Sequence, residues 1–279
     1  MSKGTNETHK TMATSPVMVF KSIKAGNKWE GADWTIADED ALAELIARIA
    51  VGQHLHVMRV LEETGTLPYA PTQNAKDGAI ALLTATKPGI PYQRDGWMFQ
   101  AISWIAANLQ DATTLKSPPH IIPADKGFDG LHLRLDETNT EVISVIICED
   151  KATDGPRGKI QGQVWPEFEE MESGRRENEL VSETSTLLAQ NSHVDPERAV
   201  HEILWQRARA YRVSITVGDK EHSDDGREAL FKGYDEVVTG SAAQRRRAET
   251  FYQENLRQWM DHMAAKAIAA VCAMEASDV

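Results

Sequence analysis

The amino-acid sequence predicts an α/β fold, in which a mixed β-sheet is flanked by helices and further helices lie towards both ends of the chain. Two observations favour this class. Segments with alternating apolar and polar residues, typical of strands, occur in the middle of the chain and again over residues 211–218. Segments with apolar residues at helical spacing precede, separate and follow them. That order is expected to place helices on both faces of one sheet.

The first third of the chain is expected to be mainly helical. Residues 1–15 are polar and rich in Thr, Ser and Lys, so we expect them to be disordered or loosely attached. A short strand is predicted over 17–24. Apolar residues at helical spacing over 38–63, interrupted at Gly52, predict two helices or one kinked helix. Residues 73–86 predict another helix.

Residues 16–279 are expected to form one domain, with a catalytic core over about 95–190 and a C-terminal strand and helical part over 195–279. The remaining elements are predicted as a helix over 95–110, a strand over 120–122, a hairpin of 129–136 with 141–151, helices near 166–173, 177–190 and 196–210, a strand over 211–218 and a long helix over 244–276. The last of these contains no Gly or Pro and carries an apolar stripe, which predicts packing on the domain or a homo-oligomer contact.

The predicted hairpin gathers charged residues at one end of an apolar face. An antiparallel register that sets Asp129 opposite Glu149 makes the two carboxylates neighbours. The period of two places Asp129 on the face of the leucines in its own arm, and places Lys151 on the face of Glu149. Two buried carboxylates beside one ammonium are costly unless each finds a partner. A Mg²⁺ ion, which prefers oxygen ligands and shares its shell with substrate phosphates, would supply one.

These residues resemble the core motif of a known enzyme superfamily. Phe128-Asp129-Gly130, followed after the length of a hairpin by Glu149-Asp150-Lys151, is similar to the D…(D/E)xK motif of the PD-(D/E)xK nucleases. The resemblance implies a restriction-endonuclease-like fold, Asp129 and Glu149 as ligands of Mg²⁺ or Mn²⁺, the backbone of Asp150 as an extra ligand, and Lys151 as the catalytic lysine. It further implies hydrolysis of DNA phosphodiester bonds, as in bacterial anti-phage defence and restriction systems.

Two neighbouring segments extend the resemblance. The helix over 95–110 is expected to point Gln100 into the site, where related nucleases place an acidic or amide side chain; the more usual glutamate is absent. After the hairpin, Gln161 with Trp165 four residues later is similar to a QxxxY element. Pro166 predicts a helix start, so Gln161 and Gln163 are expected to lie just before that helix, with Lys159, as contacts to substrate or to the metal-bound water.

The composition frames these expectations. The formal net charge of −12 disfavours a protein that binds DNA tightly by itself, so a helicase or ATPase partner that holds DNA is expected. Two cysteines without a pairing pattern and the lack of a long apolar stretch predict a cytoplasmic protein with no membrane contact. Alternatives remain: a non-catalytic nuclease-fold subunit, a metal-dependent hydrolase of a small phosphorylated substrate, or a plain strand-end ion pair at Glu149 and Lys151.

Overall fold

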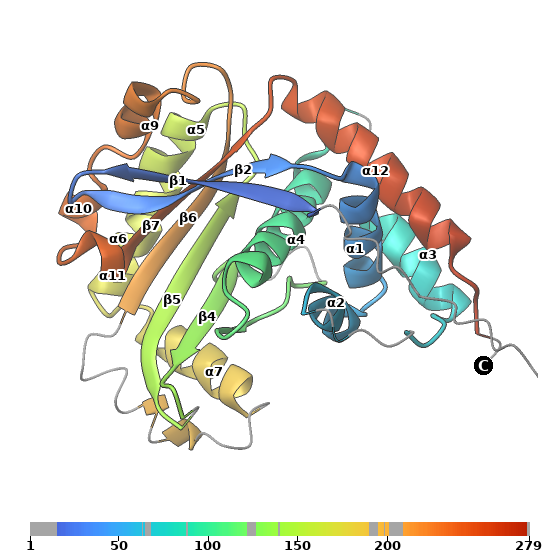
Figure 1. Ribbon diagram of the computed structural model, residues 1–279, viewed down its shortest axis with the longest axis horizontal. Helices are drawn as coiled ribbons and strands as arrows, with labels where there is room; N and C mark the ends of the chain where they lie inside the picture. The colour runs from blue at the N-terminus through green and yellow to red at the C-terminus, as the bar shows by residue number, and fades with distance from the viewer. Residues whose placement is uncertain are drawn as a thin grey trace, which may run out of the picture.

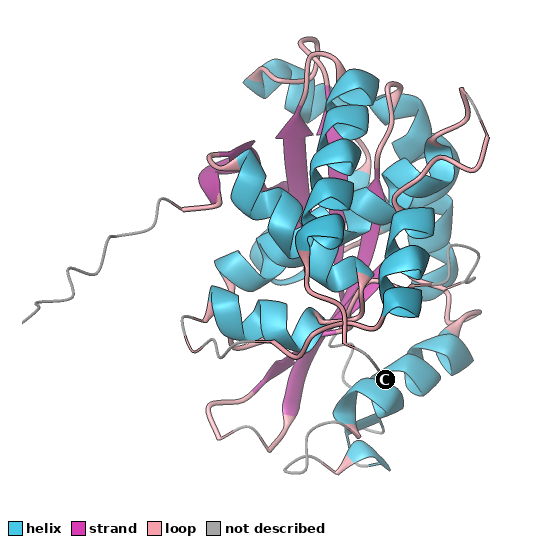
Figure 2. Ribbon diagram, turned by 90° about the vertical axis from the view of Figure 1, so that its right-hand side faces the viewer, coloured by secondary structure: helices cyan, strands magenta, loops and turns pink. Residues whose placement is uncertain are grey.

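The computed structural model describes residues 16–277 except for 63, 65–67, 88, 122–126, 139, 190–194, 198 and 201–208. The expected disorder of residues 1–15 and most of the helix expected over 196–210 lie outside the described residues. Within the described part of the chain, a mixed seven-stranded sheet lies between helices on both faces, as Figure 1 and Figure 2 show. The predicted α/β class is confirmed.

Four neighbouring strands of the sheet run parallel. The strands are β1 (Met18–Ala25), β2 (Trp29–Ile36), β3 (Leu115–Lys116), β4 (Gly130–Leu135), β5 (Val142–Lys151), β6 (Arg209–Val217) and β7 (Arg246–Tyr252). Their order across the sheet is β1-β2-β7-β6-β5-β4-β3. β2, β7, β6 and β5 pair in parallel, whereas β1 and the β3–β4–β5 side pair antiparallel. Central parallel strands are covered on both faces, which explains their nearly continuous burial.

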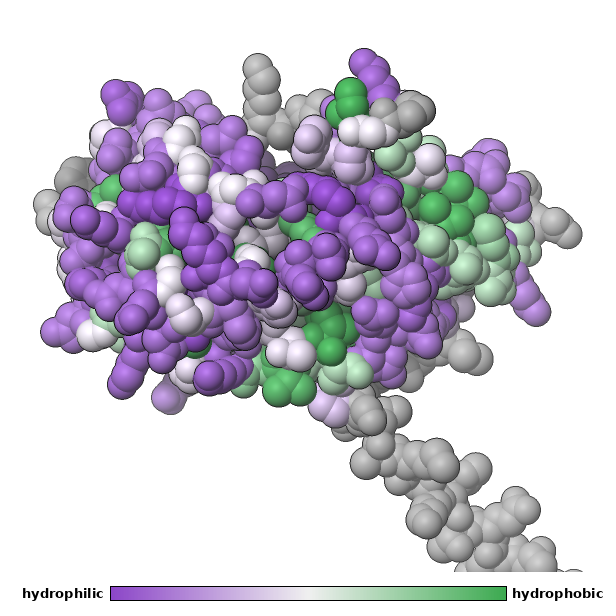
Figure 3. All heavy atoms as spheres, turned by 90° about the horizontal axis from the view of Figure 1, so that it is seen from above, coloured by the Kyte–Doolittle hydropathy of each residue, from purple (hydrophilic) through white to green (hydrophobic). Residues whose placement is uncertain are grey.

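The helices form one layer on each side of the sheet. They are α1 (Glu39–Ala50), α2 (His54–Leu61), α3 (Gln73–Leu82), α4 (Tyr92–Gln110), α5 (Pro156–Lys159), the π-helix η1 (Ile160–Val164), α6 (Trp165–Glu172), α7 (Glu177–Leu188), α9 (Asp224–Leu230), α10 (Tyr234–Val237), α11 (Ala242–Arg245) and α12 (Leu256–Ala273). One apolar core joins α1, α3, α4 and α12 to the sheet, and a second joins η1, α6, α7 and α10 to the other face. The face of the molecule in Figure 3 is mostly hydrophilic, with apolar groups gathered towards the side of α12.

The predicted hairpin is confirmed as β4 and β5. Gly130 pairs with Cys148 and Leu131 with Ile147, and the same register continues to Arg134 before a bulge. This is the register expected from the sequence, so Asp129, just before β4, lies at the level of Glu149. Alternation sends Leu131, Ile147 and their neighbours into the second core, and sends the side chains between them towards α4.

The single long helix predicted over 244–276 is wrong. Arg246–Tyr252 form β7, and α12 begins only at Leu256. β7 is hydrogen-bonded on both sides, to β2 and β6. Its residues Phe251 and Ala248 enter the first and the second core, on opposite faces of the sheet. Sheet pairing and burial outweigh the helix propensity of this segment. The strand β2 was not predicted, and β3 forms at Leu115–Lys116 instead of at 120–122.

The apolar stripe of the last helix is used inside the chain. Met260 and Met263 are fully buried in the first core, where α12 packs on α1 and α3. Trp259 donates its indole N–H to Glu39 at 2.8 Å. The stripe that suggested a homo-oligomer contact is therefore covered by the protein's own helices.

Candidate active site

Three charged side chains meet where β5 ends beside the start of β4. The Lys151 ammonium lies 2.6 Å from Asp129 Oδ2 and 2.6 Å from Glu149 Oε2. The hairpin register sets the two carboxylates side by side, and the period of two brings Lys151 to the face of Glu149. The structure thus brings together the three residues that the sequence singled out as catalytic.

Asp129 is held from several sides. Its Oδ1 accepts a hydrogen bond of 2.6 Å from Gln100 Nε2, which reaches the site from α4. Its Oδ2 accepts from Lys151 and, at 2.9 Å, from the backbone N–H of Asp150. Each donor compensates negative charge and fixes the orientation of the carboxylate. Gln100 therefore contacts the site, as the sequence predicted.

Burial differs among the three charged residues and determines their electrostatics. The Glu149 side chain is 2% exposed, whereas Lys151 and Asp129 are 17% and 18% exposed. Burial raises the pKa of Glu149 well above its usual value, against the attraction of Lys151 and with a further rise from Asp129. Burial by itself lowers the pKa of Lys151, but Glu149 and Asp129 raise it above the usual value. Lys151 is thus held as an ammonium by the two carboxylates.

A further carboxylate, Glu167, faces this group from α6. Its negative charge adds to the rise in the pKa of Glu149 that burial and Asp129 cause. The segment from Ile160 to Phe168 buries Ile160, Val164 and Phe168 against the sheet, and Glu167 lies on the margin of that face. Glu167 was not among the predicted site residues, because Pro166 predicts that the helix starts there. Helical spacing from Ile160 onward was the signal that could have identified it.

Asp150 contributes to the site through its backbone, since its side chain points to the other face of the sheet. There Asp150 Oδ1 accepts a hydrogen bond of 2.6 Å from Ser103 of α4 and lies 3.9 Å from Arg212 Nη1 of β6. Burial raises the pKa of Asp150 to about 6, although Arg212 favours the charged form. The expected metal contact of Asp150 is therefore restricted to its backbone atoms.

The remaining predicted residues lie in a helical segment and not before one, which corrects the expectation for Gln161 and Gln163. The chain is helical from Pro156 through η1 into α6, and both glutamines are exposed. The π-helical turn includes Gly162, four residues before Pro166, where an α-helical carbonyl would meet the proline ring. Among the described residues, no hydrogen bond or ion pair joins Lys159, Gln161 or Gln163 to the three central charges.

The carboxylates of the candidate site supply some, but not all, of the ligands that a small divalent cation needs. Asp129 and Glu149 offer hard carboxylate oxygens on one surface, with one ammonium between them. In the described part of the chain, no three His, Cys, Asp or Glu side chains are arranged to hold an ion. A Mg²⁺ site with few protein ligands, completed by waters and substrate phosphate oxygens, fits this arrangement, because Mg²⁺ is commonly held by one or two carboxylates.

Comparison with family models, with curated proteins and with solved structures gives no match to this chain. Among the described helices, none combines the length and the apolarity needed to cross a lipid bilayer.

Proposed function

We propose that this protein is a metal-dependent nuclease that hydrolyses DNA phosphodiester bonds, of the PD-(D/E)xK type that its motif resembles. The observation that supports the proposal is the contact of Lys151 with both Asp129 and Glu149 at the end of a central hairpin. Glu149 and Lys151 are largely buried, yet Asp129 and Lys151 remain reachable from solvent. A partly open group of this composition is suited to hydrolytic chemistry on a phosphate.

Each residue of the candidate site has a separate role in the proposed reaction. Asp129 and Glu149 would hold Mg²⁺ or Mn²⁺, which supplies an activated water and screens the charge that builds on the phosphate. Gln100 and the Asp150 N–H keep Asp129 in one orientation. Lys151 carries a fixed positive charge beside both carboxylates, from where it can orient a water or stabilise negative charge on a phosphate oxygen.

The proposal includes a protein partner that presents the DNA. Arg157, Arg245 and Arg246 donate to backbone carbonyls within the fold. Arg176 lies with its guanidinium over the ring of Phe128 at 5.2 Å, but it is paired with Glu179. A chain of net charge −12 with this distribution is better suited to act on DNA held by another subunit, such as a helicase or ATPase. A cytoplasmic role in bacterial anti-phage defence or restriction is part of the proposal by analogy alone.

The test is cleavage of plasmid DNA, single-stranded DNA and RNA by the purified chain with Mg²⁺ or Mn²⁺, alone and with a candidate helicase partner. Glu149→Gln and Lys151→Ala are each expected to lower the cleavage rate at least about 100-fold. Glu137→Gln, on the turn of the same hairpin, and Lys220→Ala, whose side chain is 88% exposed, are matched controls expected to keep the activity.

Equal activity of the four variants would assign the cleavage to a contaminant. A folded protein that cleaves none of these substrates under any of these conditions would refute the nuclease proposal. The small number of protein oxygen ligands would then favour a non-catalytic subunit with a nuclease-like fold.

A further inference from the structure

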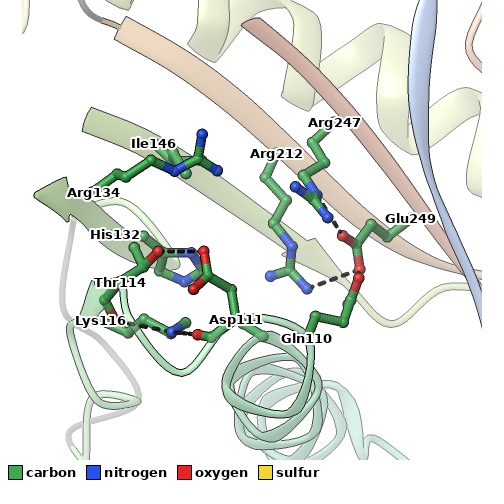
Figure 4. Close-up of a pocket in the computed structure, with 11 residues that line it drawn as sticks. Gln110, Asp111, Thr114, Lys116, His132, Arg134, Ile146, Arg212, Arg247 and Glu249 are labelled. Atoms are coloured by element: carbon green, nitrogen blue, oxygen red, sulfur yellow. Dashed lines mark hydrogen bonds and ion pairs between the residues drawn. The ribbon is translucent and has the colours of Figure 1, made fainter. Parts of the chain in front are cut away.

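A second polar site lies on the sheet face opposite Glu149 and Lys151. It is a small pocket where α4 ends and leaves the sheet uncovered, shown in Figure 4. Its walls come from β4, β5, β6, β7 and the segment after α4. Its charged lining residues are Asp111, Lys116, Arg134, Arg212, Arg247 and Glu249. Four cations against two carboxylates leave an excess of two positive charges, in a chain whose net charge is −12.

The charges of this pocket are only partly compensated inside the protein. Arg212 donates to Glu249 at 3.1 Å and is buried, so it is committed to the fold. Among the described residues, no acceptor contacts the guanidinium of Arg134, which is partly buried at the pocket wall. Arg247 donates from Nε to Glu249 at 3.2 Å, which is its one side-chain contact of this kind within the described residues, and its side chain is 44% exposed. The outer N–H groups of Arg134 and Arg247 remain available as donors.

Lys116 adds a cation whose ammonium contacts no carboxylate in the part of the chain that the structure describes. Its Nζ donates to the backbone carbonyls of Asp111 and Thr114. Burial, against the attraction of Asp111 and with a smaller contribution from Arg212, lowers the pKa of Lys116 to about 8. Lys116 and Arg212 both line the pocket, and an anion placed between these two cations would reduce their mutual repulsion.

The shape of the pocket limits the size of its ligand. Ala107 is the small side chain that α4 directs at the pocket, and Ile146 of β5 forms an apolar wall. The enclosed space is about 30 Å³, which is enough for one or two oxygen-sized groups. Arg134 and Arg247 lie where they can contact the remaining oxygens of a ligand that enters only in part (Figure 4).

We infer that this pocket binds one phosphate-class oxyanion, with oxygens directed inward towards Lys116 and Arg212 and the others contacted by Arg134 and Arg247. Planar guanidinium groups with free N–H donors match phosphate oxygens in geometry and charge. The anion can be inorganic phosphate, the phosphate of a mononucleotide or a phosphodiester of a polynucleotide. The inference does not depend on the nuclease proposal, because the pocket and the Lys151 group lie on opposite faces of β5.

The test is calorimetric titration of the full chain at constant ionic strength in EDTA, which removes divalent cations from the other site. The probes are inorganic phosphate, a nucleoside 5′-monophosphate and a single-stranded oligonucleotide without terminal phosphate. Arg134→Gln and Arg247→Gln are each expected to weaken binding at least about tenfold. Ala107→Leu, which fills the pocket without changing charge, is expected to abolish it. Arg59→Gln on α2 is the matched charge control and is expected to bind like the wild type.

The three probes distinguish the sources of the anion. Binding of phosphate or the mononucleotide, lost in the pocket variants, supports a free ligand; binding of the oligonucleotide alone, lost in the same variants, supports a polynucleotide. The inference is overturned if no probe binds, or if Arg134→Gln, Arg247→Gln and Ala107→Leu bind as the wild type does. Circular dichroism and thermal melting of each variant separate loss of binding from loss of folding. Because Arg134 has no acceptor among the described residues, its substitution is expected to leave the melting temperature unchanged.

Discussion

Replacing Lys151 by Met provides the sharpest test of the charge balance at the candidate active site. The substitution keeps the length and apolar stem of the side chain and removes only the ammonium. At an effective dielectric constant of about 20, each 2.6 Å contact of Lys151 corresponds to roughly 6 kcal/mol of attraction. Desolvation and the mutual repulsion of Asp129 and Glu149 offset much of this. Removing one partner of a buried pair typically costs about 3–5 kcal/mol.

We therefore expect Lys151→Met to lower the free energy of unfolding by about 3–5 kcal/mol in EDTA at neutral pH. For a domain of this size the Tm falls by roughly 6–15 °C. Urea unfolding followed by circular dichroism measures the free energy, and calorimetry measures the Tm. The control Lys220→Met removes an exposed ammonium and is expected to change the free energy by less than about 0.5 kcal/mol.

Addition of Mg²⁺ then tests whether the same carboxylates hold a cation. Without the ammonium, Asp129 and Glu149 face each other uncompensated, so Mg²⁺ is expected to raise the Tm of Lys151→Met by more than that of the wild type. At a concentration about 100 times its Kd, a ligand stabilises the folded state by about 2.7 kcal/mol. Equal stability of Lys151→Met and Lys220→Met in EDTA would refute the reasoning about Lys151, and equal melting curves with and without Mg²⁺ would refute the metal site.

Three further predictions concern other parts of the molecule. Gln100→Leu, which removes the 2.6 Å hydrogen bond to Asp129, is expected to slow DNA cleavage about tenfold with little change in Tm; an unchanged rate would exclude a positioning role. Lys116 has a pKa of about 8 in the folded protein and about 10.4 when unfolded, so the folded state holds fewer protons between these values and stability rises with pH there. Urea unfolding is expected to show that, from pH 7.5 to 10, the free energy of unfolding of the wild type rises on the order of 2–3 kcal/mol more than that of Lys116→Met. Parallel pH dependence of the two free energies would contradict this prediction. Phe168→Ala removes a fully buried side chain beside Tyr211 and Tyr234. It is expected to lower the free energy of unfolding, measured by urea unfolding, by about 3–5 kcal/mol. A loss under about 1 kcal/mol would mean that the second core collapses around the gap.

The hairpin and its charged end could be predicted because the information is local. Strict alternation fixes which residues share a face, and a slip of one residue would move each side chain of the slipped strand to the opposite face. That is why the register linking Gly130 to Cys148, and the contact of Lys151 with both carboxylates, follow from the sequence. The expectation that Gln100 reaches the site came instead from the resemblance to the nuclease motif, because the pattern of its helix does not show which polar side chain points to the hairpin.

Other elements depend on distant parts of the chain. β7 has a sequence that suits a helix, and it is a strand because β2 and β6 offer hydrogen-bonding partners on both sides. β2 contains Gly31, and a Cβ atom there would lie 1.8 Å from Ala248 O. The close approach of β7 therefore requires glycine at this position. No local pattern reveals that approach. The helix that carries Glu167 could not be predicted to begin before Pro166, because a proline usually marks a helix start. The π-helical turn accommodates Pro166 inside the helix.

The alternation of β5 explains why one strand can serve two chemically different sites. Glu149 and Lys151 point to one face, while Asp150 between them points to the other, where Ser103 bridges it to Arg212. Arg212 in turn pairs with Glu249, which accepts from Arg247 at the oxyanion pocket. A buried arginine among carboxylates contributes little net stability compared with apolar packing, but it is costly to rearrange once formed. The network therefore fixes the backbone of β5 at Asp150, whose N–H holds Asp129. Rigidity on the α4 face of the sheet is thus a condition for the geometry of the carboxylates on the other.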